Sequence, residues 1–211
     1  MFKKWTKKTA NHFQIHLNNM KKLFVILLLF LPLDIIAQEI KVVETDLFTI
    51  GYSERLQQPV WAEYTVQCPN GTASRSGMDF YEDIEIFTSD DDDYKGNVWD
   101  KGHMAPAAAF SCTREMLRET FTYLNSALQH QSLNRGVWNR LEAFERDLAN
   151  FYEVSVHIAV LFDEDSEVLP TGATVPNGFR KTISFDDKTV IFEFPNEQIS
   201  GKRWIDFKLE P

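Results

Sequence analysis

Apolar and polar residues alternate along several stretches of the chain, a two-residue period typical of strands with one buried face. β-branched and aromatic residues, which favour strands, are enriched in the same stretches. The pattern predicts strands over Ile40–Tyr52, Val60–Gln67, Met78–Thr88 and Val154–Phe162, and a hairpin in which Thr182–Ser184 and Thr189–Phe194 flank Asp186-Asp187.

Two other stretches carry the longer period of an amphipathic helix. The first is a short helix over Thr113–Tyr123, and the second covers Arg135–Phe151. The apolar side of the second is formed by Val137, Leu141, Phe144, Leu148 and Phe151. The sequence therefore predicts an α+β fold in which a mostly antiparallel sheet carries two helices.

Polar segments separate these elements. Asn70-Gly71 is a turn signal. Ser89–Gly96 is a polar loop that contains four consecutive aspartates, Asp90 to Asp93. They could be a calcium loop, but the spaced ligands and terminal glutamate of an EF-hand are missing. A solvated acidic loop is the preferred interpretation.

The first 37 residues have the order of a secretory signal peptide. Met20-Lys21-Lys22 is followed by the apolar run Leu23–Leu33 and by a small residue, Ala37, near a plausible cleavage point. The preceding residues are either a long basic region or translation from an upstream start. An uncleaved membrane anchor is the alternative, although the run is short for a spanning helix. We expect a secreted or periplasmic protein.

Net charge limits the kinds of partner. The chain has 22 Lys and Arg against 31 Asp and Glu, for a formal charge of −9. Removal of residues 1–37 takes away six lysines and one aspartate, which leaves a charge of −14. Proteins that hold nucleic acid by general electrostatics are basic, so the acidity argues against long-lived, non-specific binding. The acidity does not exclude a catalyst, because a locally basic cleft with a divalent cation can hold the scissile phosphate while the outer surface stays acidic.

Residues 38–211 have the length of one domain, and no repeat or linker divides them. Two cysteines remain, Cys68 and Cys112. In an exported chain they suggest one disulfide, with two buried free thiols as the alternative.

Three histidines lie beyond the signal segment. His157 belongs to a predicted strand and is interpreted as packed in a sheet, and His130 is interpreted as a solvated loop residue. His103 follows Asp100-Lys101-Gly102, in which the glycine lets the backbone approach a ligand closely and the lysine offers a cation to phosphate. Alone, this segment is more typical of a turn with a partly exposed histidine than of a catalytic site.

A second segment adds metal chemistry. In a helix, Asn134, Trp138 and Glu142 are spaced to lie on one face, so an amide oxygen and a carboxylate would project together. Such oxygens suit magnesium or manganese. The alternative is a helix N-cap at Asn134 with a surface glutamate.

Taken together, the two segments resemble the signatures of the DNA/RNA non-specific endonucleases of the ββα-metal class. The first is Asp100-Lys101-Gly102-His103 with the following Pro-containing stretch, and the second comprises Asn125, Gln129 and Leu133–Glu142. The likeness extends in order from about Ile40 to Phe194. It implies a ββα-metal motif with flanking helices.

The resemblance also implies roles for individual residues. His103 is similar to the family's general base, Asn134 to its direct magnesium ligand, and Glu142 to the carboxylate that holds the metal's water shell. Asn125 matches a supporting asparagine, and Arg75 is the candidate for phosphate contact. Products with a 5′-phosphate are expected.

Two positions depart from the family pattern. Lys101 replaces a commoner arginine and loses its bidentate fork, so we expect weaker substrate positioning. Gln129-His130-Gln131 replaces a commoner Pro-Gln, so the loop before Asn134 could be placed differently.

Three functional classes follow. The leading one is a secreted, magnesium-dependent endonuclease acting on DNA and/or RNA. The others are a nucleic-acid-binding module with weakened catalysis and a cell-surface interaction domain on the same fold.

Overall fold

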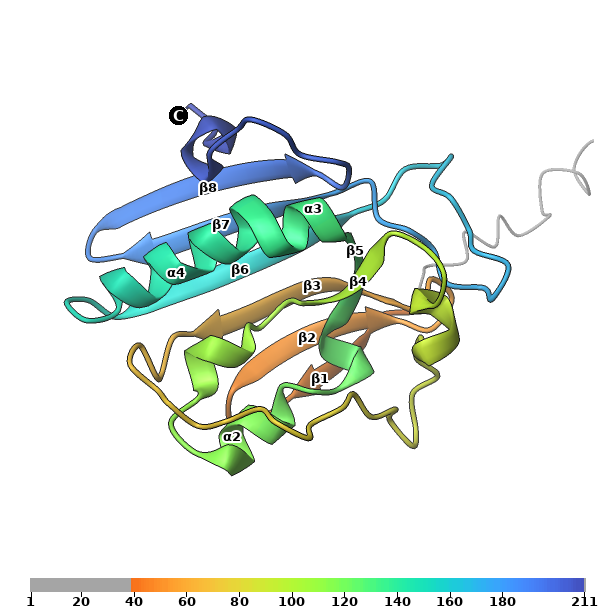
Figure 1. Ribbon diagram of the computed structural model, residues 1–211, viewed down its shortest axis with the longest axis horizontal. Coiled ribbons are helices and arrows are strands. Elements are labelled where there is room, and N and C mark those ends of the chain that lie inside the picture. The colour runs from red at the N-terminus through yellow and green to blue at the C-terminus, as the bar shows by residue number, and fades with distance from the viewer. Residues whose placement is uncertain (1–38, 211) are drawn as a thin grey trace, which may run out of the picture. The chain divides into compact units, whose positions relative to one another are not determined.

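A six-stranded antiparallel sheet runs through the computed structural model, which describes residues 39–210 (Figure 1). Its order is β1-β2-β3-β6-β7-β8. The strands are β1 (Lys41–Glu44), β2 (Phe48–Ser53), β3 (Gln58–Thr65), β6 (Val154–Leu161), β7 (Gly178–Phe185) and β8 (Lys188–Pro195). The predicted α+β class and antiparallel sheet are confirmed. The signal-peptide prediction for residues 1–37 lies outside the described residues.

A separate two-stranded ribbon, β4 (Trp99–His103) with β5 (Ser126–His130), carries the histidine motif. The helical segments are α2 (Arg114–Glu119), α3 (Gln131–Leu133), a π-type turn over Asn134–Trp138, and α4 (Asn139–Leu148). Single 3₁₀ turns occur at Asp91–Tyr94, Ala107–Phe110, Tyr123–Asn125 and Trp204–Phe207. No helix in residues 39–210 is long and apolar enough to cross a membrane.

One face of the large sheet is buried. Ile50, Ile158 and Phe179 on that face pack in one core with Trp138 and Leu141 from the helical segment. On the opposite face the register aligns Glu63, His157 and Thr182. His157 lies in β6, within the sheet as predicted; its side chain is 44% exposed and lies 3.9 Å from Glu63.

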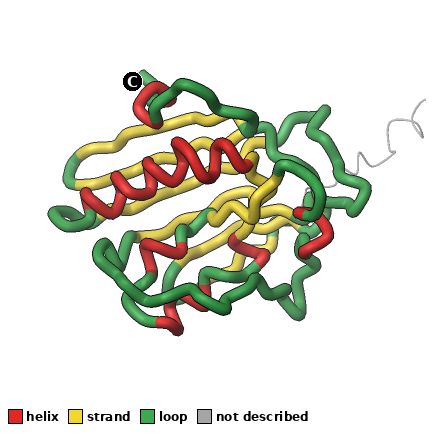
Figure 2. Tube along the Cα trace, viewed as in Figure 1, coloured by secondary structure: helices red, strands yellow, loops and turns green. Residues whose placement is uncertain are grey.

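Two predicted strands were wrong in detail. Ile40–Tyr52 is a hairpin rather than one strand, because the Thr45 hydroxyl accepts hydrogen bonds from the amides of Leu47 and Phe48 and turns the chain. Met78–Thr88 alternates in sequence but forms no strand; it belongs to the long, mostly irregular connection between β3 and β4 (Figure 2).

Side chains explain the irregular course of Met78–Thr88. Asp83 accepts hydrogen bonds from the amides of Glu85 and Ile86, and such local bonds compete with strand pairing. Ile84 is 98% exposed, so the apolar alternation does not mark a buried face here.

The helical predictions were partly confirmed. α2 begins after Thr113, which caps it by accepting a hydrogen bond from the Met116 amide, but it ends at Glu119 rather than at Tyr123. The longer helix has its regular part at Asn139–Leu148, after the π-type turn in which Gly136 has non-helical dihedrals. Phe151, predicted on its apolar side, is 81% exposed.

The remaining turn predictions agree with the structure. The amide of Gly71 donates to the carbonyl of Cys68, and β7 and β8 form a hairpin around Asp186-Asp187. The acidic loop is more ordered than predicted. Asp90 and Asp93 cap the 3₁₀ turn reciprocally, and Asp93 is buried. His130 is the last residue of β5 rather than a loop residue.

Side-chain amides attach the ribbon to the rest of the core. Gln58 accepts a hydrogen bond from the Leu128 amide at 2.8 Å. Asn196 donates to the Leu128 carbonyl at 2.9 Å and accepts from the His130 amide at 2.8 Å. Because β5 has a strand neighbour on one side only, these side chains satisfy its other edge.

A buried ion pair joins α4 to the sheet. Lys181 of β7 donates to Glu145 of α4 at 2.9 Å, and both side chains are at most 1% exposed. The Tyr64 hydroxyl donates to the other Glu145 oxygen at 2.6 Å. The Lys181 ammonium also lies 4.0 Å from the centroid of the Trp138 ring. These contacts fix the position of α4 over β3 and β7.

Candidate active site

The ribbon and the following helical segment form a ββα unit, and a cavity of about 480 Å³ opens beside it. The lining residues come from segments that are far apart in sequence. They include Arg75, Phe80, Lys101, His103, Phe121, Asn134, Arg135, Asn139 and Glu142. Of the predicted site residues, only Asn125 is absent from this lining.

His103 is at the end of β4, and its ring packs against two aromatic side chains that also contact each other. The ring centroids are 4.9 Å from Phe80 and 5.0 Å from Phe121. Nε2 is buried and has no hydrogen-bond partner in the described part of the chain. Burial, and secondarily the positive charge of Arg75, lowers the pKa of His103 to about 4. The imidazole is therefore neutral at pH 7, as a proton acceptor must be.

The glycine before His103 has a steric role. A Cβ atom on Gly102 would lie 2.5 Å from Cβ of Gln129 on the paired strand. The close approach that the sequence predicted at this glycine is therefore to β5 rather than to a ligand.

Asn134 begins the π-type turn and is held by an aspartate of the first motif. Its Nδ2 donates to Asp100 at 3.0 Å. Arg135 donates to both Asp100 oxygens, at 2.8 and 2.5 Å. These bonds fix the amide orientation and leave Oδ1, a metal-ligating type of oxygen, outside the hydrogen bond to Asp100.

Glu142 lies in the first turn of α4 and lines the same cavity. Burial raises the pKa of Glu142 to about 7, against the opposing effect of Lys181. Trp138, predicted on the same helix face, is fully buried against Phe179 instead. The non-helical Gly136 breaks the regular period, so Asn134 and Glu142 share the cavity without Trp138.

The donor set fits a hard, hydrated cation rather than one enclosed by protein. No cluster of three or more His, Cys, Asp or Glu suited to a metal ion occurs in residues 39–210. An amide oxygen and a carboxylate in one cavity match magnesium, which usually keeps several waters and binds few protein ligands. Thiolate ligands are absent there because Cys68 and Cys112 form a disulfide, as the first cysteine hypothesis predicted.

Lys101 lines the cavity, but its charge is already paired. Its Nζ donates to Asp91 in a short hydrogen bond and lies 3.6 Å from Asp79. It also lies 5.0 Å from the ring centroid of Tyr123 and 5.2 Å from that of Phe80. The structure corrects the expectation of a free ammonium for phosphate, and it shows that Asp91 is not simply solvated.

Asn125 is fully buried and acts on the backbone. It accepts from the Ala105 amide at 2.7 Å and donates to the carbonyls of Ala105 and Thr120 at 2.9 Å. Asn125 was predicted to support the site, and its contacts hold the backbone at Ala105, two residues after His103.

Asp100, Arg135 and Phe80 were not predicted from the sequence as site residues. Asp100 was recognisable as part of the first motif, yet its contact with Asn134 spans 34 positions. Phe80 belongs to the segment that was wrongly predicted as a strand, and nothing in its spacing indicated contact with His103.

Comparison with known proteins agrees with this geometry. The sequence model of the family "DNA/RNA non-specific endonuclease" matches residues 36–210. Mitochondrial Nuclease EXOG of Xenopus laevis is 38% identical over 109 residues, which cover 49% of this chain and 30% of that protein. Mitochondrial Endonuclease G of Bos taurus is 30% identical over 111 residues, 50% of this chain and 37% of that protein. The chain thus matches about a third of the length of these relatives.

Two further matches cover more of the chain. Nuclease C1 of Cunninghamella echinulata var. echinulata is 30% identical over 184 residues, 75% of this chain and 73% of that protein. A solved structure described as an EndoG/EndoGI complex, for a mechanism of EndoG inhibition, matches with a TM-score of 0.72 and 29% identity over 81% of this chain and 80% of that chain. The fold, the cavity and the family match together establish that this chain belongs to the DNA/RNA non-specific endonuclease family.

Proposed function

We propose that this protein is a magnesium-dependent endonuclease that hydrolyses phosphodiester bonds of DNA and/or RNA, with manganese as a possible substitute. The observation that carries the proposal is that His103, Asn134 and Glu142 line one cavity although they come from β4, the π-type turn and α4. A base, an amide oxygen and a carboxylate are the groups that a one-metal phosphodiesterase needs.

His103 accepts the proton of the attacking water. Water adds to phosphorus, the bond to the 3′ oxygen breaks, and that oxygen takes up a proton, which leaves a 5′-phosphate and a 3′-hydroxyl. The role requires a neutral imidazole, and the lowered pKa leaves His103 neutral at pH 7, although it also makes the ring a weaker base than an ordinary histidine.

Asn134 and Glu142 would hold the metal, Asn134 directly and Glu142 through its water. A bound divalent cation supplies stabilisation of charge on the phosphoryl and leaving oxygens. Arg75 contacts the phosphate, a role supported by its position in the cavity lining and by the absence of any ion pair to it among residues 39–210.

Plasmid digestion tests the proposal. The purified protein should nick and degrade plasmid with magnesium and lose activity in EDTA, and His103→Ala and Asn134→Ala should each be strongly impaired. Equal cleavage under all these conditions would identify a contaminating nuclease. End-labelling of the products should detect 5′-phosphates, and parallel assays on single-stranded DNA, duplex DNA and RNA define the preferred substrate.

A binding module with weakened catalysis is the second candidate. It is favoured by one observation, the pairing of Lys101 with Asp91 and Asp79, which removes a cation from the substrate surface. Oligonucleotide binding without detectable cleavage at saturating magnesium would support it. A cell-surface interaction domain would show neither binding nor cleavage.

We also propose export from the cytoplasm, directed by residues 1–37. The basic segment and the short apolar run motivate this proposal. Fractionation with N-terminal sequencing of the recovered protein tests it, and a cytoplasmic protein that retains Met1 would contradict it.

A further inference from the structure

The loop that carries Arg75 is organised around a tight turn. The Met78 amide donates to the Arg75 carbonyl at 3.0 Å, and Gly77 at the third turn position has a φ of +71°. That dihedral is the mark of a type II turn and favours glycine. The turn shapes the loop, but Arg75 itself is exposed and needs further contacts to stay at the cavity.

Arg114, the first residue of α2, bonds to both sides of Arg75. Its Nη1 donates to the Ser74 carbonyl at 2.8 Å and its Nη2 donates to the Ser76 carbonyl at 3.2 Å. One planar guanidinium therefore bridges the two residues that flank Arg75. A lysine ammonium cannot reproduce this fork.

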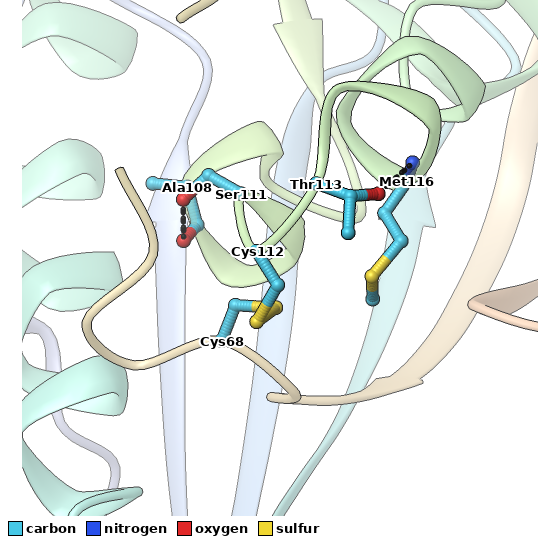
Figure 3. The surroundings of a disulfide bond; sticks show 6 residues. All are labelled: Cys68, Ala108, Ser111, Cys112, Thr113 and Met116. Atoms are coloured by element: carbon cyan, nitrogen blue, oxygen red, sulfur yellow. Dashed lines mark hydrogen bonds between the residues drawn. A yellow bond between two sulfur atoms is a disulfide. The ribbon is translucent and has the colours of Figure 1, made fainter. Parts of the chain in front are cut away.

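The segment that carries Arg114 is anchored to the start of the same loop. The Cys68–Cys112 disulfide joins the chain after β3 to the residues just before α2, where Thr113 caps the helix (Figure 3). The Ala73 amide donates to the Ser111 carbonyl at 2.9 Å. The disulfide and this hydrogen bond therefore hold the start of α2, and with it Arg114, in place beside the loop.

We infer that Arg114 is a positioning residue that holds Arg75 in the catalytic cavity, where Arg75 binds the substrate phosphate. The inference rests on the proposed function, because Arg75 has its phosphate role there. Arg114 lines a neighbouring hollow together with Met78 and Phe80, which also line the catalytic cavity, but it does not itself line that cavity. It therefore acts on the substrate through Arg75.

Oligonucleotide binding in EDTA separates this role from direct contact. Fluorescence anisotropy would give the slope of log affinity against log salt for the parent protein, Arg75→Ala, Arg114→Ala and the double variant. This slope is negative, and the loss of one phosphate contact decreases its magnitude by about 1. We expect a decrease of about 1 in each single variant and still about 1 in the double variant. A decrease of about 2 in the double variant would mean two independent contacts and would overturn the inference.

Two controls address charge and folding. Arg114→Lys keeps the charge but not the fork, so it should behave like Arg114→Ala; parent-like binding by Arg114→Lys would also overturn the inference. Arg180→Ala removes an exposed arginine on β7, which does not line the cavity, and should leave the slope unchanged. Thermal unfolding of each variant checks that it is folded.

Hydrogen exchange gives a readout that needs neither nuclease activity nor binding. In Arg114→Ala, amides in peptides spanning residues 72–80 should exchange several-fold faster, whereas Arg75→Ala should leave them unchanged. Unchanged exchange in Arg114→Ala would overturn the inference even in a fully active enzyme. A protein with faster exchange but no nuclease activity would instead contradict the proposed function while leaving the restraint of the loop in place.

Discussion

The folded structure shifts the pKa values of two residues in the cavity, His103 and Glu142. Burial keeps the His103 imidazole neutral and makes the Glu142 carboxylate costly to ionise. The two shifts have opposite effects on stability. Between pH 4 and 6.5 the unfolded chain binds more protons at His103 than the folded chain does, so this residue makes the protein more stable as pH rises. Between pH 4.5 and 7 the folded chain binds more protons at Glu142, so that residue makes the protein less stable as pH rises.

Glu142→Gln should stabilise the metal-free protein at high pH. Because the pKa of Glu142 is raised to about 7, the parent loses stability as pH rises from about 4.5 through 7, and the variant does not. We expect the free energies of unfolding in EDTA to be similar at pH 4.5 and the variant to be more stable at pH 8, by up to about 3 kcal/mol. Denaturant titrations at several pH values measure the difference. The contribution of His103 is common to both proteins, so a pH-independent difference would contradict the expectation.

Asp100→Asn should weaken the response to magnesium. The variant loses the charge that holds Asn134 and Arg135, and loss of a residue that orients a metal ligand typically costs about 10- to 100-fold in metal affinity or activity. The magnesium concentration for half-maximal cleavage should rise accordingly. Asp187→Asn, in the hairpin turn, is the matched control. Equal magnesium dependence in the two variants would show that Asp100 does not orient the site.

At the scale of elements, the site depends on how α4 is seated on the sheet. Lys181, Glu145 and Tyr64 form a buried network between β7, α4 and β3, one helical turn from Glu142. Such a network is costly to bury, and its value lies in fixing one arrangement.

Lys181→Met should destabilise the protein strongly. The substitution leaves the Glu145 carboxylate buried without its cation, and breaking a buried pair on one side costs about 3–5 kcal/mol. The free energy of unfolding at pH 7 measures this loss. Combining Lys181→Met with Glu145→Met should recover most of it, because no unpaired charge remains. A double variant as unstable as the single one would mean that packing, rather than charge, holds α4.

At the scale of the whole molecule, long-range connections hold the irregular part to the sheet. The disulfide closes a loop between positions 44 residues apart, and that loop includes Arg75 and His103. The core on one sheet face unites strands from both ends of the described chain with the ribbon and α4. The acidic surface and the small number of unpaired cations at the cavity fit transient rather than lasting contact with a polyanion.

Removal of the disulfide should lower both stability and substrate binding. For a loop of this length the chain-entropy relation gives about 4 kcal/mol, and measured losses are commonly about 2–5 kcal/mol. Cys68→Ser with Cys112→Ser should therefore unfold at lower denaturant concentration. The variant should also show a higher KM, because the Arg75 loop loses its anchor, while kcat changes less. An unchanged KM in a folded variant would show that the disulfide does not position the Arg75 loop for substrate binding.

The sequence by itself determined the elements whose signal is local. Alternation marked β6 and the β7–β8 hairpin because their residues face a core on one side and solvent on the other. The spacing within the two motifs marked His103, Asn134 and Glu142, and the structure brings all three to one cavity. The family could be recognised from those residues because the chemistry requires particular side chains in order.

Tertiary structure decided what depends on partners distant in sequence. Met78–Thr88 has a strand pattern but lacks a full strand partner, so its side chains cap their own backbone and Phe80 packs on His103. Lys101 carries a positive charge that could bind phosphate, but in the folded protein this charge is paired with Asp91 and Asp79. Asp100 and Arg114 orient groups 34 and about 40 positions away through hydrogen bonds. Which ion pairs form, and which cations stay available to substrate, depends on distances in the folded chain that local spacing does not encode.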